Sequence, residues 1–454
     1  MTSKPELAKQ KLESILNDMS SNHWLFSNAP GHAFMRQGLG KLDFYDTMRL
    51  VLAMGKGTTA DELNDYFDLD PDRIPSKSAL VQRRKQISLS AFEYLFEEFS
   101  SSFPQITNRF KGRSVLAADG CHVVYSTNAE IIEDFKKPRL IDHKGYNHMH
   151  LNGFVDVFSK AFLDVMVQPG QDPDERQALH QMLDHYKPDR PEDSIITADR
   201  GYESYDLLFH CELRHFSYVF RLKDPDSGKC ILSSFKDELP NDQEEYDVTV
   251  RRFFTDKKNK VMKQQDSVYL YMNPNKNVPH FYELLGDRHL LYLTFRVLRI
   301  RTADNTYEYI ITNLPHEFDL EDIKCCYHAR WGIELAFRYL KHAAGLLHFH
   351  SKKTEYLRQE IYATLTMYNF GVFLANEAAM MNRTIERDPD NKYTYEVDFS
   401  TALRTARKYF LRDTLTKPVD IIRLLCKYVH AVKEEFRLFP RNLRGIGAIR
   451  FNYR

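Results

Sequence analysis

The chain has 454 residues, of which 43% are hydrophobic and 13% are aromatic. This composition excludes a disordered chain, and the length predicts two or three folded units. The 63 Lys and Arg balance the 63 Asp and Glu, so the net charge alone indicates no class of partner. None of the six cysteines forms a Cys-x-x-Cys pair, which argues against a structural zinc site of the usual spacing. The polar N-terminus and the lack of a long apolar run predict a cytoplasmic protein without a membrane span.

Residues 1–108 are predicted to form a helical N-terminal domain, because apolar residues recur there at helical spacing. Ser76 is a predicted N-cap of a helix that carries Arg83, Arg84 and Lys85. A helix, a short connection and a basic helix are typical of a helix-turn-helix module, which makes these three residues candidate DNA contacts. A charged helix face exposed to solvent is an equal alternative.

Residues 109–224 are predicted to form the first part of an α/β core. The segments Ser114–Asp119 and Ser194–Asp199 are short apolar runs that each end in aspartate, with a glycine close behind. Between them lie two strand-like runs, which predict a hairpin, and one helical segment. Apolar runs without alternation are typical of strands buried on both faces, and ligands bind at the carboxyl ends of such strands. We therefore expect both aspartates at strand ends, where the glycines let the chain turn away.

The remaining chain divides into three regions. Residues 225–312 contain several β-rich runs separated by polar loops, which predict an all-β insertion. Helical patterns resume over residues 313–383, the predicted second part of the α/β core. Residues 384–454 are predicted to form a basic helical C-terminal region, since positions 401–454 hold 13 Lys or Arg against 4 Asp or Glu.

One segment of the second core part aligns residues that suit phosphate chemistry. On a single helix, Tyr327, Arg330, Glu334 and Lys341 would lie within an arc of about 60°. An apolar stripe would lie beside them and pack on a sheet. A surface helix with mixed charges is the alternative. Together with the two aspartates, Glu334 would complete a compact acidic cluster of oxygen ligands, which suits Mg²⁺ or Mn²⁺.

The spacing of Tyr, two residues, Arg, three residues, Glu, six residues and Lys resembles the signature of the bacterial insertion sequence 4 family of DDE transposases. The resemblance covers roughly residues 110–350 and includes Asp119-Gly, Asp199-Arg-Gly-Tyr and the segment around Glu334. It implies an RNase H-like catalytic core that carries an insertion. It also implies that Asp119, Asp199 and Glu334 are the catalytic residues and hold two Mg²⁺ ions, for which Mn²⁺ can substitute.

The resemblance also implies roles in DNA binding. Tyr327, Arg330 and Lys341 would contact phosphates near the cut, and Trp331 would stack on an unpaired base or serve in packing. The expected substrates are double-stranded transposon ends with terminal inverted repeats, and target DNA. They would be cut and joined by a homodimer in a cut-and-paste reaction. A DNA-binding protein derived from a transposase and an RNase H-like metal-dependent nuclease are the alternatives.

Overall fold

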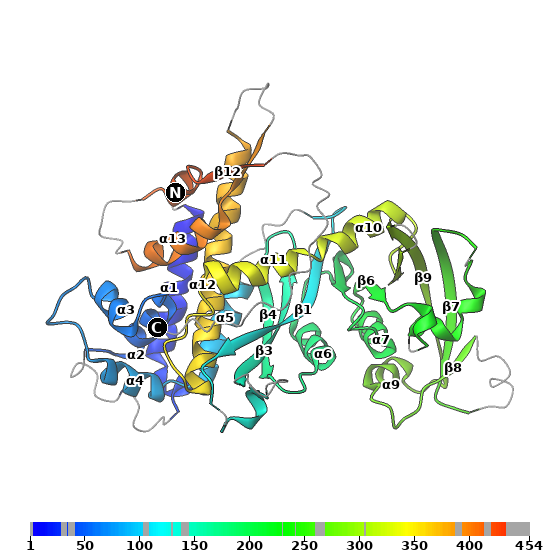
Figure 1. Ribbon diagram of the computed structural model, residues 1–454, viewed down its shortest axis with the longest axis horizontal. Helices are drawn as coiled ribbons and strands as arrows, with labels where there is room; N and C mark the ends of the chain where they lie inside the picture. The colour runs from blue at the N-terminus through cyan, green and yellow to red at the C-terminus, as the bar shows by residue number, and fades with distance from the viewer. Residues whose placement is uncertain are drawn as a thin grey trace.

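The computed structural model describes residues 3–28, 34, 41–102, 109–128, 130–137, 145–228, 230–240, 242–258, 268–303, 306–385, 393–412 and 419–432. Within these ranges the chain is a mixed α/β protein with one large sheet, which confirms that part of the expected fold class (Figure 1). The strands are β1 (Ser114–Tyr125), β2 (Phe135–Lys136), β3 (Tyr146–Asp156), β4 (Phe162–Pro169), β5 (Ser194–Ala198), β6 (Ser217–Leu222), β7 (Tyr246–Thr255), β8 (Tyr269–Tyr271), β9 (Leu290–Ala303), β10 (Thr306–Thr312), β11 (Thr394–Val397) and β12 (Val429–Val432).

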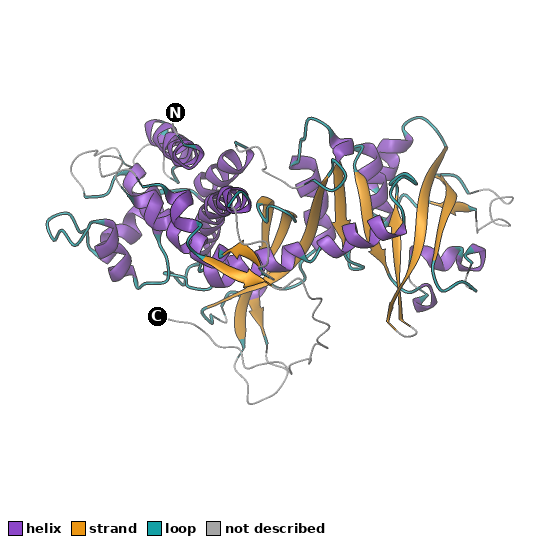
Figure 2. Cartoon of the chain, turned by 90° about the horizontal axis from the view of Figure 1, so that it is seen from above, coloured by secondary structure: helices purple, strands orange, loops and turns teal. Residues whose placement is uncertain are grey.

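The helices gather at one end of the molecule and on both faces of the sheet (Figures 1 and 2). They are α1 (Lys4–Ser21), α2 (Phe44–Ala53), α3 (Thr59–Tyr66), α4 (Lys77–Gln86), α5 (Leu89–Ser101), α6 (Glu175–His185), α7 (Tyr205–Leu213), α9 (Pro279–Leu285), α10 (Leu320–Ala329), α11 (Gly332–Arg338), α12 (Thr354–Arg383), α13 (Phe399–Leu411) and α14 (Ile421–Leu425). Helix α11 continues into the π-helical turn η7 (Tyr339–Ala343). In the part of the chain that the structure describes, no helix has both the length and the apolar character needed to cross a bilayer.

The sheet runs in the order β2-β3-β1-β5-β6-β10-β9-β7-β8, with β4 also paired to β3. Strands β3 and β4 form the predicted hairpin, and β3 is antiparallel to β1. Strands β1, β5 and β6 are parallel to one another. The sheet therefore changes from antiparallel to parallel pairing at β1, the strand that carries Asp119.

Both faces of the central strands are covered, as the non-alternating apolar runs predict. Val115 and Ala117 of β1 pack in one core, together with residues of α5, α11 and α12. Leu116 and Ala118, which point the other way, pack in a second core with residues of α6, α7 and α9. Since successive side chains of a strand alternate between faces, the odd-numbered residues of β1 face α11 and α12.

Two expectations for the regions outside the first core part are wrong. The 225–312 segment has the predicted strands β7, β9 and β10, but it also contains helix α9 and three short 3-10 helices, so it is not all-β. Its strands extend the central sheet and share its hydrogen bonds. The C-terminal region is not wholly helical, because β11 and β12 pair antiparallel beside α13 and α14. The basic stretch 433–454 lies outside the described residues.

Candidate active site

Strands β1 and β5 bring the two predicted aspartates together. Their parallel register pairs Leu116 with Ile196 and Ala117 with Thr197. Asp119 and Asp199 each lie two residues beyond the last of these pairs, and the charge of Asp199 acts on Asp119. The side chain of Asp119 has the parity of Ala117 and therefore belongs to the face that α11 and α12 cover.

The two aspartates differ in their backbone surroundings. Asp199 follows the end of β5, as predicted, and its Oδ1 accepts a hydrogen bond of 2.7 Å from the Gly201 amide. Asp119 does not end a strand, which corrects the sequence prediction: β1 continues to Tyr125, and Asp119 pairs with Gly153 of β3. Its Oδ1 accepts a hydrogen bond of 2.8 Å from the Gly120 amide.

Gly120 makes room on the opposite face and does not turn the chain. A Cβ atom at this position would overlap the His150 ring and the Glu175 carboxylate. These two side chains meet behind the strand, with 3.0 Å between His150 Nε2 and Glu175 Oε1. Glycine is therefore required here because another side chain would displace a carboxylate that lies next to Asp119.

The predicted single helix around Glu334 is interrupted. Helix α10 ends at Ala329 and α11 begins at Gly332, with Arg330 and Trp331 in the turn between them. A Cβ atom at Gly332 would lie 2.7 Å from the carbonyl oxygen of Val157, so the start of α11 presses against the turn between β3 and β4. The segment from Tyr327 to Lys341 is therefore not the single regular helix of the prediction, because a two-residue turn and the π-helical turn η7 divide it.

Arg330 nevertheless links Glu334 to the aspartates. Its Nη1 lies 3.9 Å from Asp119 Oδ2, and its Nη2 lies 3.8 Å from Glu334 Oε1. Its guanidinium carbon is 5.6 Å from the ring centres of both Tyr327 and Trp331, and the residue is only 6% exposed. The guanidinium is thus a nearly buried cation between two of the three predicted catalytic carboxylates.

The three carboxylates share this region without converging on one point. Among the described residues, Asp119, Asp199 and Glu334 do not form a group whose oxygen atoms all lie within 4.8 Å of one another. Like charges at shorter distances repel unless cations neutralise them. The only neutralising group among these contacts is Arg330, which keeps Asp119 and Glu334 on its two sides.

Burial and neighbouring acids make ionisation of Asp119 unfavourable. The pKa of Asp119 is raised from 3.8 to about 6, chiefly by burial and also by the charges of Asp199 and Glu175, against the lowering effect of the Gly120 amide and Arg330. Glu175 therefore belongs to the electrostatic environment of the site, although the sequence analysis did not select it. Its position at the start of a helix indicates an ordinary first-turn acid, and only the packing of α6 on β1 and β3 shows where it lies.

We expect Asp119→Asn to stabilise the metal-free protein. Because the folded-state pKa of about 6 lies above 3.8, the folded state holds the proton more tightly between these pH values. The ionised carboxylate then costs about 3 kcal/mol above pH 6, and this cost disappears as the pH falls below 4. Urea unfolding in EDTA at pH 7.5 should show a gain of about 1–3 kcal/mol for the variant, shrinking toward pH 5. An equal or lower stability of the variant at pH 7.5 would contradict the raised pKa of Asp119.

The other predicted residues of this segment lie at different depths. Lys341, in η7, is close enough to Cys121 of β1 to oppose the burial-driven rise of the pKa of that thiol, and it is half-buried. Trp331 is 36% exposed, so part of its ring is accessible. Tyr327 is 6% exposed, and burial raises its pKa while Arg330 and Arg221 oppose the rise. Tyr327 therefore packs beside the Arg330 guanidinium in the protein interior.

The basic residues of α4 do not form one surface. Ser76 caps this helix as predicted, and Lys85 is exposed. Arg83 is half-buried, with its guanidinium carbon 5.3 Å from the Phe34 ring centre. Arg84 is 3% exposed and donates hydrogen bonds to groups of α12. Arg84 is thus placed for packing between helices, and Lys85 is the residue of the three that faces solvent.

Comparisons with known proteins give a family match and a similar solved structure. A family model described as "Transposase DDE domain" matches residues 111–370, a span that includes Asp119, Asp199 and Glu334. Among solved structures, the chain is similar to one titled "Cryo-EM structure of piggyBac transposase synaptic complex with hairpin DNA (SNHP)". That similarity has a TM-score of 0.41 and 10% sequence identity, and it covers 97% of this chain and 86% of that chain. None of the curated proteins compared matches the sequence.

Proposed function

The chain belongs to the transposase DDE domain family, and on this premise we propose that it is the transposase of a bacterial insertion sequence. We propose that it binds terminal inverted repeats and carries out metal-dependent DNA cleavage and strand transfer, with Asp119, Asp199 and Glu334 as the catalytic carboxylates. The observation that supports this most directly is the parallel pairing of β1 with β5, whose last pair lies two residues before Asp119 and Asp199, together with the effect of the Asp199 charge on Asp119. Arg330 then joins Asp119 to Glu334. The spacing of Tyr327, Arg330, Glu334 and Lys341 supports a place in the insertion sequence 4 family.

The strand order supports an RNase H-like core. Strands β4, β3 and β1 are antiparallel neighbours, and β5 and β6 follow in parallel. Three antiparallel strands followed by two parallel ones are the arrangement that an RNase H-like core requires. The segment that contains β7, β8, α9 and β9 comes between β6 and β10, which agrees with an insertion into such a core.

The residues present fit divalent cations of the Mg²⁺ or Mn²⁺ type. The donor set consists of carboxylate oxygens, which these hard cations prefer. The raised pKa of Asp119 marks a buried carboxylate whose charged form lacks sufficient compensation, and a cation would provide it. We propose that Asp119, Asp199 and Glu334 hold two such ions. When bound, the ions would activate water or a DNA 3′-hydroxyl and stabilise the leaving oxygen.

The protein's own cations and rings have separate tasks in this proposal. Arg330 is anchored between Tyr327 and Trp331, so it can hold a DNA phosphate close to the carboxylates with little loss of side-chain freedom. Lys341 supplies a further positive charge beside β1. The exposed part of Trp331 is available to stack on a base next to the cut.

The test is DNA cleavage by the full chain in the presence of Mg²⁺ or Mn²⁺. The substrate is duplex DNA that carries the inverted repeats flanking the gene, and the control reaction contains EDTA. We expect cuts at the repeat ends and joining of the released 3′ ends to a second DNA. Binding to the repeats without cleavage under any metal would favour a transposase-derived DNA-binding protein. Cleavage without end specificity and without joining would favour an RNase H-like nuclease.

Lys341→Ala is expected to weaken DNA binding and its dependence on salt. Each phosphate contact contributes about 0.9 to the slope of log K against log salt concentration, so loss of one contact should reduce the slope by about that amount. The measurement is the binding of repeat-end DNA at several salt concentrations. Lys187→Ala is the matched control, because Lys187 is exposed and follows α6, near the amino end of β5 and away from Asp199. Equal salt slopes for both variants would contradict a contact between Lys341 and DNA.

A further inference from the structure

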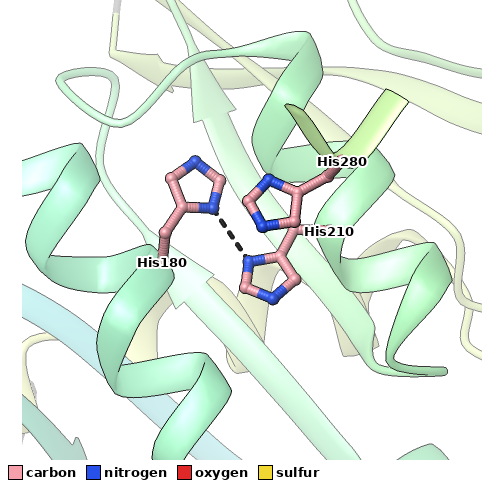
Figure 3. A group of neighbouring side chains, drawn as sticks. All are labelled: His180, His210 and His280. Atoms are coloured by element: carbon pink, nitrogen blue, oxygen red, sulfur yellow. Dashed lines mark hydrogen bonds between the residues drawn. The ribbon is translucent and has the colours of Figure 1, made fainter. Parts of the chain in front are cut away.

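Three histidines meet between helices on the face of the sheet away from Glu334. His180 lies on α6, His210 on α7 and His280 on α9, and all three are at most 9% exposed. One ring nitrogen from each lies within 4.8 Å of the others. Figure 3 shows the three rings side by side, with one nitrogen of His180 facing one nitrogen of His210. Positions 180, 210 and 280 are far apart in sequence, so no local motif indicates this cluster.

Two carboxylates determine which ring nitrogens of His210 and His280 keep a lone pair that can bind a metal ion. Asp184 Oδ1 lies 3.1 Å from His210 Nε2, so that nitrogen donates its hydrogen and leaves Nδ1 as a lone pair. Asp206 Oδ2 lies 2.7 Å from His280 Nδ1, which leaves Nε2 of His280 as a lone pair. Asp206 is itself held by a hydrogen bond of 3.0 Å from the backbone amide of His280 to its Oδ1. Carboxylates that accept from the distal nitrogen are the usual outer partners of metal-binding histidines.

The third histidine faces the same centre. His180 Nδ1 lies 2.8 Å from His210 Nδ1, so one of these two nitrogens must carry a hydrogen while no cation is bound. The rings form a near-parallel stack, with interplanar angles of 12–22° and centroids 3.9–5.0 Å apart. Burial, reinforced by the neighbouring His280, lowers the pKa of both His180 and His210 to about 4. At neutral pH the rings of His180 and His210 are therefore uncharged, which is the form that binds metal.

The charges around the cluster also leave room for a cation. Asp184 and Asp206 contribute two negative charges, and Arg214 compensates one of them through a contact of 2.6 Å with Asp184 Oδ1. Asp206, whose side chain is only 6% exposed, has histidines as its side-chain partners among these contacts. A divalent cation would offset the charge of Asp206 and replace the hydrogen bond between the two Nδ1 atoms.

We propose that His180, His210 and His280 bind one divalent transition-metal ion, with Zn²⁺ as the best match. Three imidazole nitrogens suit Zn²⁺ and its neighbours, and they do not suit Mg²⁺ or Ca²⁺. At Zn–N distances of about 2.0–2.1 Å in a tetrahedral site, ligand nitrogens lie roughly 3.3 Å apart. The 2.8 Å contact between His180 and His210 therefore has to widen slightly, and the rings have to tilt out of their stack. Water or a bound anion would complete the fourth position.

Such an ion would connect three helices that belong to different parts of the fold. Helix α6 begins with Glu175, which contributes to the electrostatics of Asp119. Helix α7 follows the turn that starts at Asp199. Helix α9 belongs to the segment between β8 and β9, outside the two core parts. The ion would attach α9 to the layer that supports both aspartates, and this role does not depend on the chemistry at those aspartates.

The test uses Co²⁺ as a spectroscopic substitute for Zn²⁺ on the full chain. Asp119→Asn/Asp199→Asn serves as the background, because it removes the candidate Mg²⁺ site. We expect one Co²⁺ per chain, with the intense visible bands of a four-coordinate nitrogen site, displaced by Zn²⁺ and not by excess Mg²⁺. His280→Gln should lose more than about 100-fold in affinity, and Asp184→Asn about 10–100-fold through the His210 contact.

The matched control is His185→Gln, a change on the same helix α6 at a histidine whose side chain is 62% exposed. It should leave the Co²⁺ spectrum and affinity unchanged. Thermal unfolding gives a second reading, since Zn²⁺ should raise the Tm of the background protein and not that of His280→Gln. The proposal is overturned if the background protein shows no four-coordinate bands, or if folded His280→Gln binds Co²⁺ as tightly as the background. The histidines would then be a metal-free stack.

Discussion

Asp119→Asn, Asp199→Asn and Glu334→Gln are each expected to abolish DNA cleavage and to leave binding of the repeat-end DNA largely intact. The reason is that a metal-held carboxylate stabilises the charge of the transition state, whereas affinity comes mainly from phosphate contacts elsewhere. Loss of several kcal/mol of such stabilisation corresponds to a rate decrease on the order of a thousandfold. Cleavage rates under single-turnover conditions and gel-shift affinities measure the two effects separately.

The control for this series is Glu321→Gln. Glu321 is on α10, in the same helical segment as Glu334, and its side chain is 74% exposed and contacts Lys324. We expect this variant to cleave at the wild-type rate. Full cleavage by Glu334→Gln would remove Glu334 from the catalytic set. If Glu175→Gln were then inactive, Glu175 would be the third carboxylate, because its charge raises the pKa of Asp119.

Arg84→Met is expected to cost about 3–5 kcal/mol of unfolding free energy, because it leaves a buried carboxylate without its partner. Arg84 Nη1 lies 2.7 Å from Glu360 Oε1, and Nη2 donates to the Tyr356 carbonyl at 2.9 Å. Burial by itself would raise the pKa of Glu360, but Arg84 and His350 overcome this and hold it below its usual value. The Arg84–Glu360 pair fastens α4 to α12, so its loss should loosen the whole N-terminal helical layer.

Lys85→Met is the matched control, since Lys85 is the next residue of the same helix and is exposed. Urea unfolding should place this variant within about 0.5 kcal/mol of the wild type. If Lys85 contacts DNA, the variant should bind DNA more weakly without losing stability, the opposite of the pattern for Arg84→Met. A stable Arg84→Met protein with weakened DNA binding would restore Arg84 to the set of DNA contacts.

The carboxylate site and the Arg84–Glu360 pair show what the sequence could and could not predict. The apolar runs before Asp119 and Asp199 predict buried neighbouring strands, and the structure has them. In segment 327–341, residue types and spacing alone were enough to select Glu334 and Arg330 as candidate site residues. The close approach of Gly332 to Val157 could not be predicted, because it is a contact between segments far apart in sequence.

The remaining errors have the same origin in tertiary packing. From the sequence, Arg84 is expected to be an exposed cation. Only the position of α12 shows that it is buried and paired with Glu360. Glu175 reads as a first-turn acid, and only the packing of α6 brings it beside Asp119. The end of β1 was misplaced because Gly120 indicates a turn in sequence, whereas here it accommodates the contact between His150 and Glu175.

The position of Asp119 within β1 has a mechanical consequence. Its backbone is fixed by pairing with β3, so it cannot shift without breaking the sheet ladder. Asp199 lies in a turn after β5, and Glu334 lies on a short helix that follows a break. Any backbone movement that brings the three carboxylates toward a shared cation would therefore occur at Asp199 and Glu334, while the backbone of Asp119 stays in place. Substrate-induced tightening of such a site would show as changed amide exchange in residues 199–202 and 330–338, with β1 unaffected.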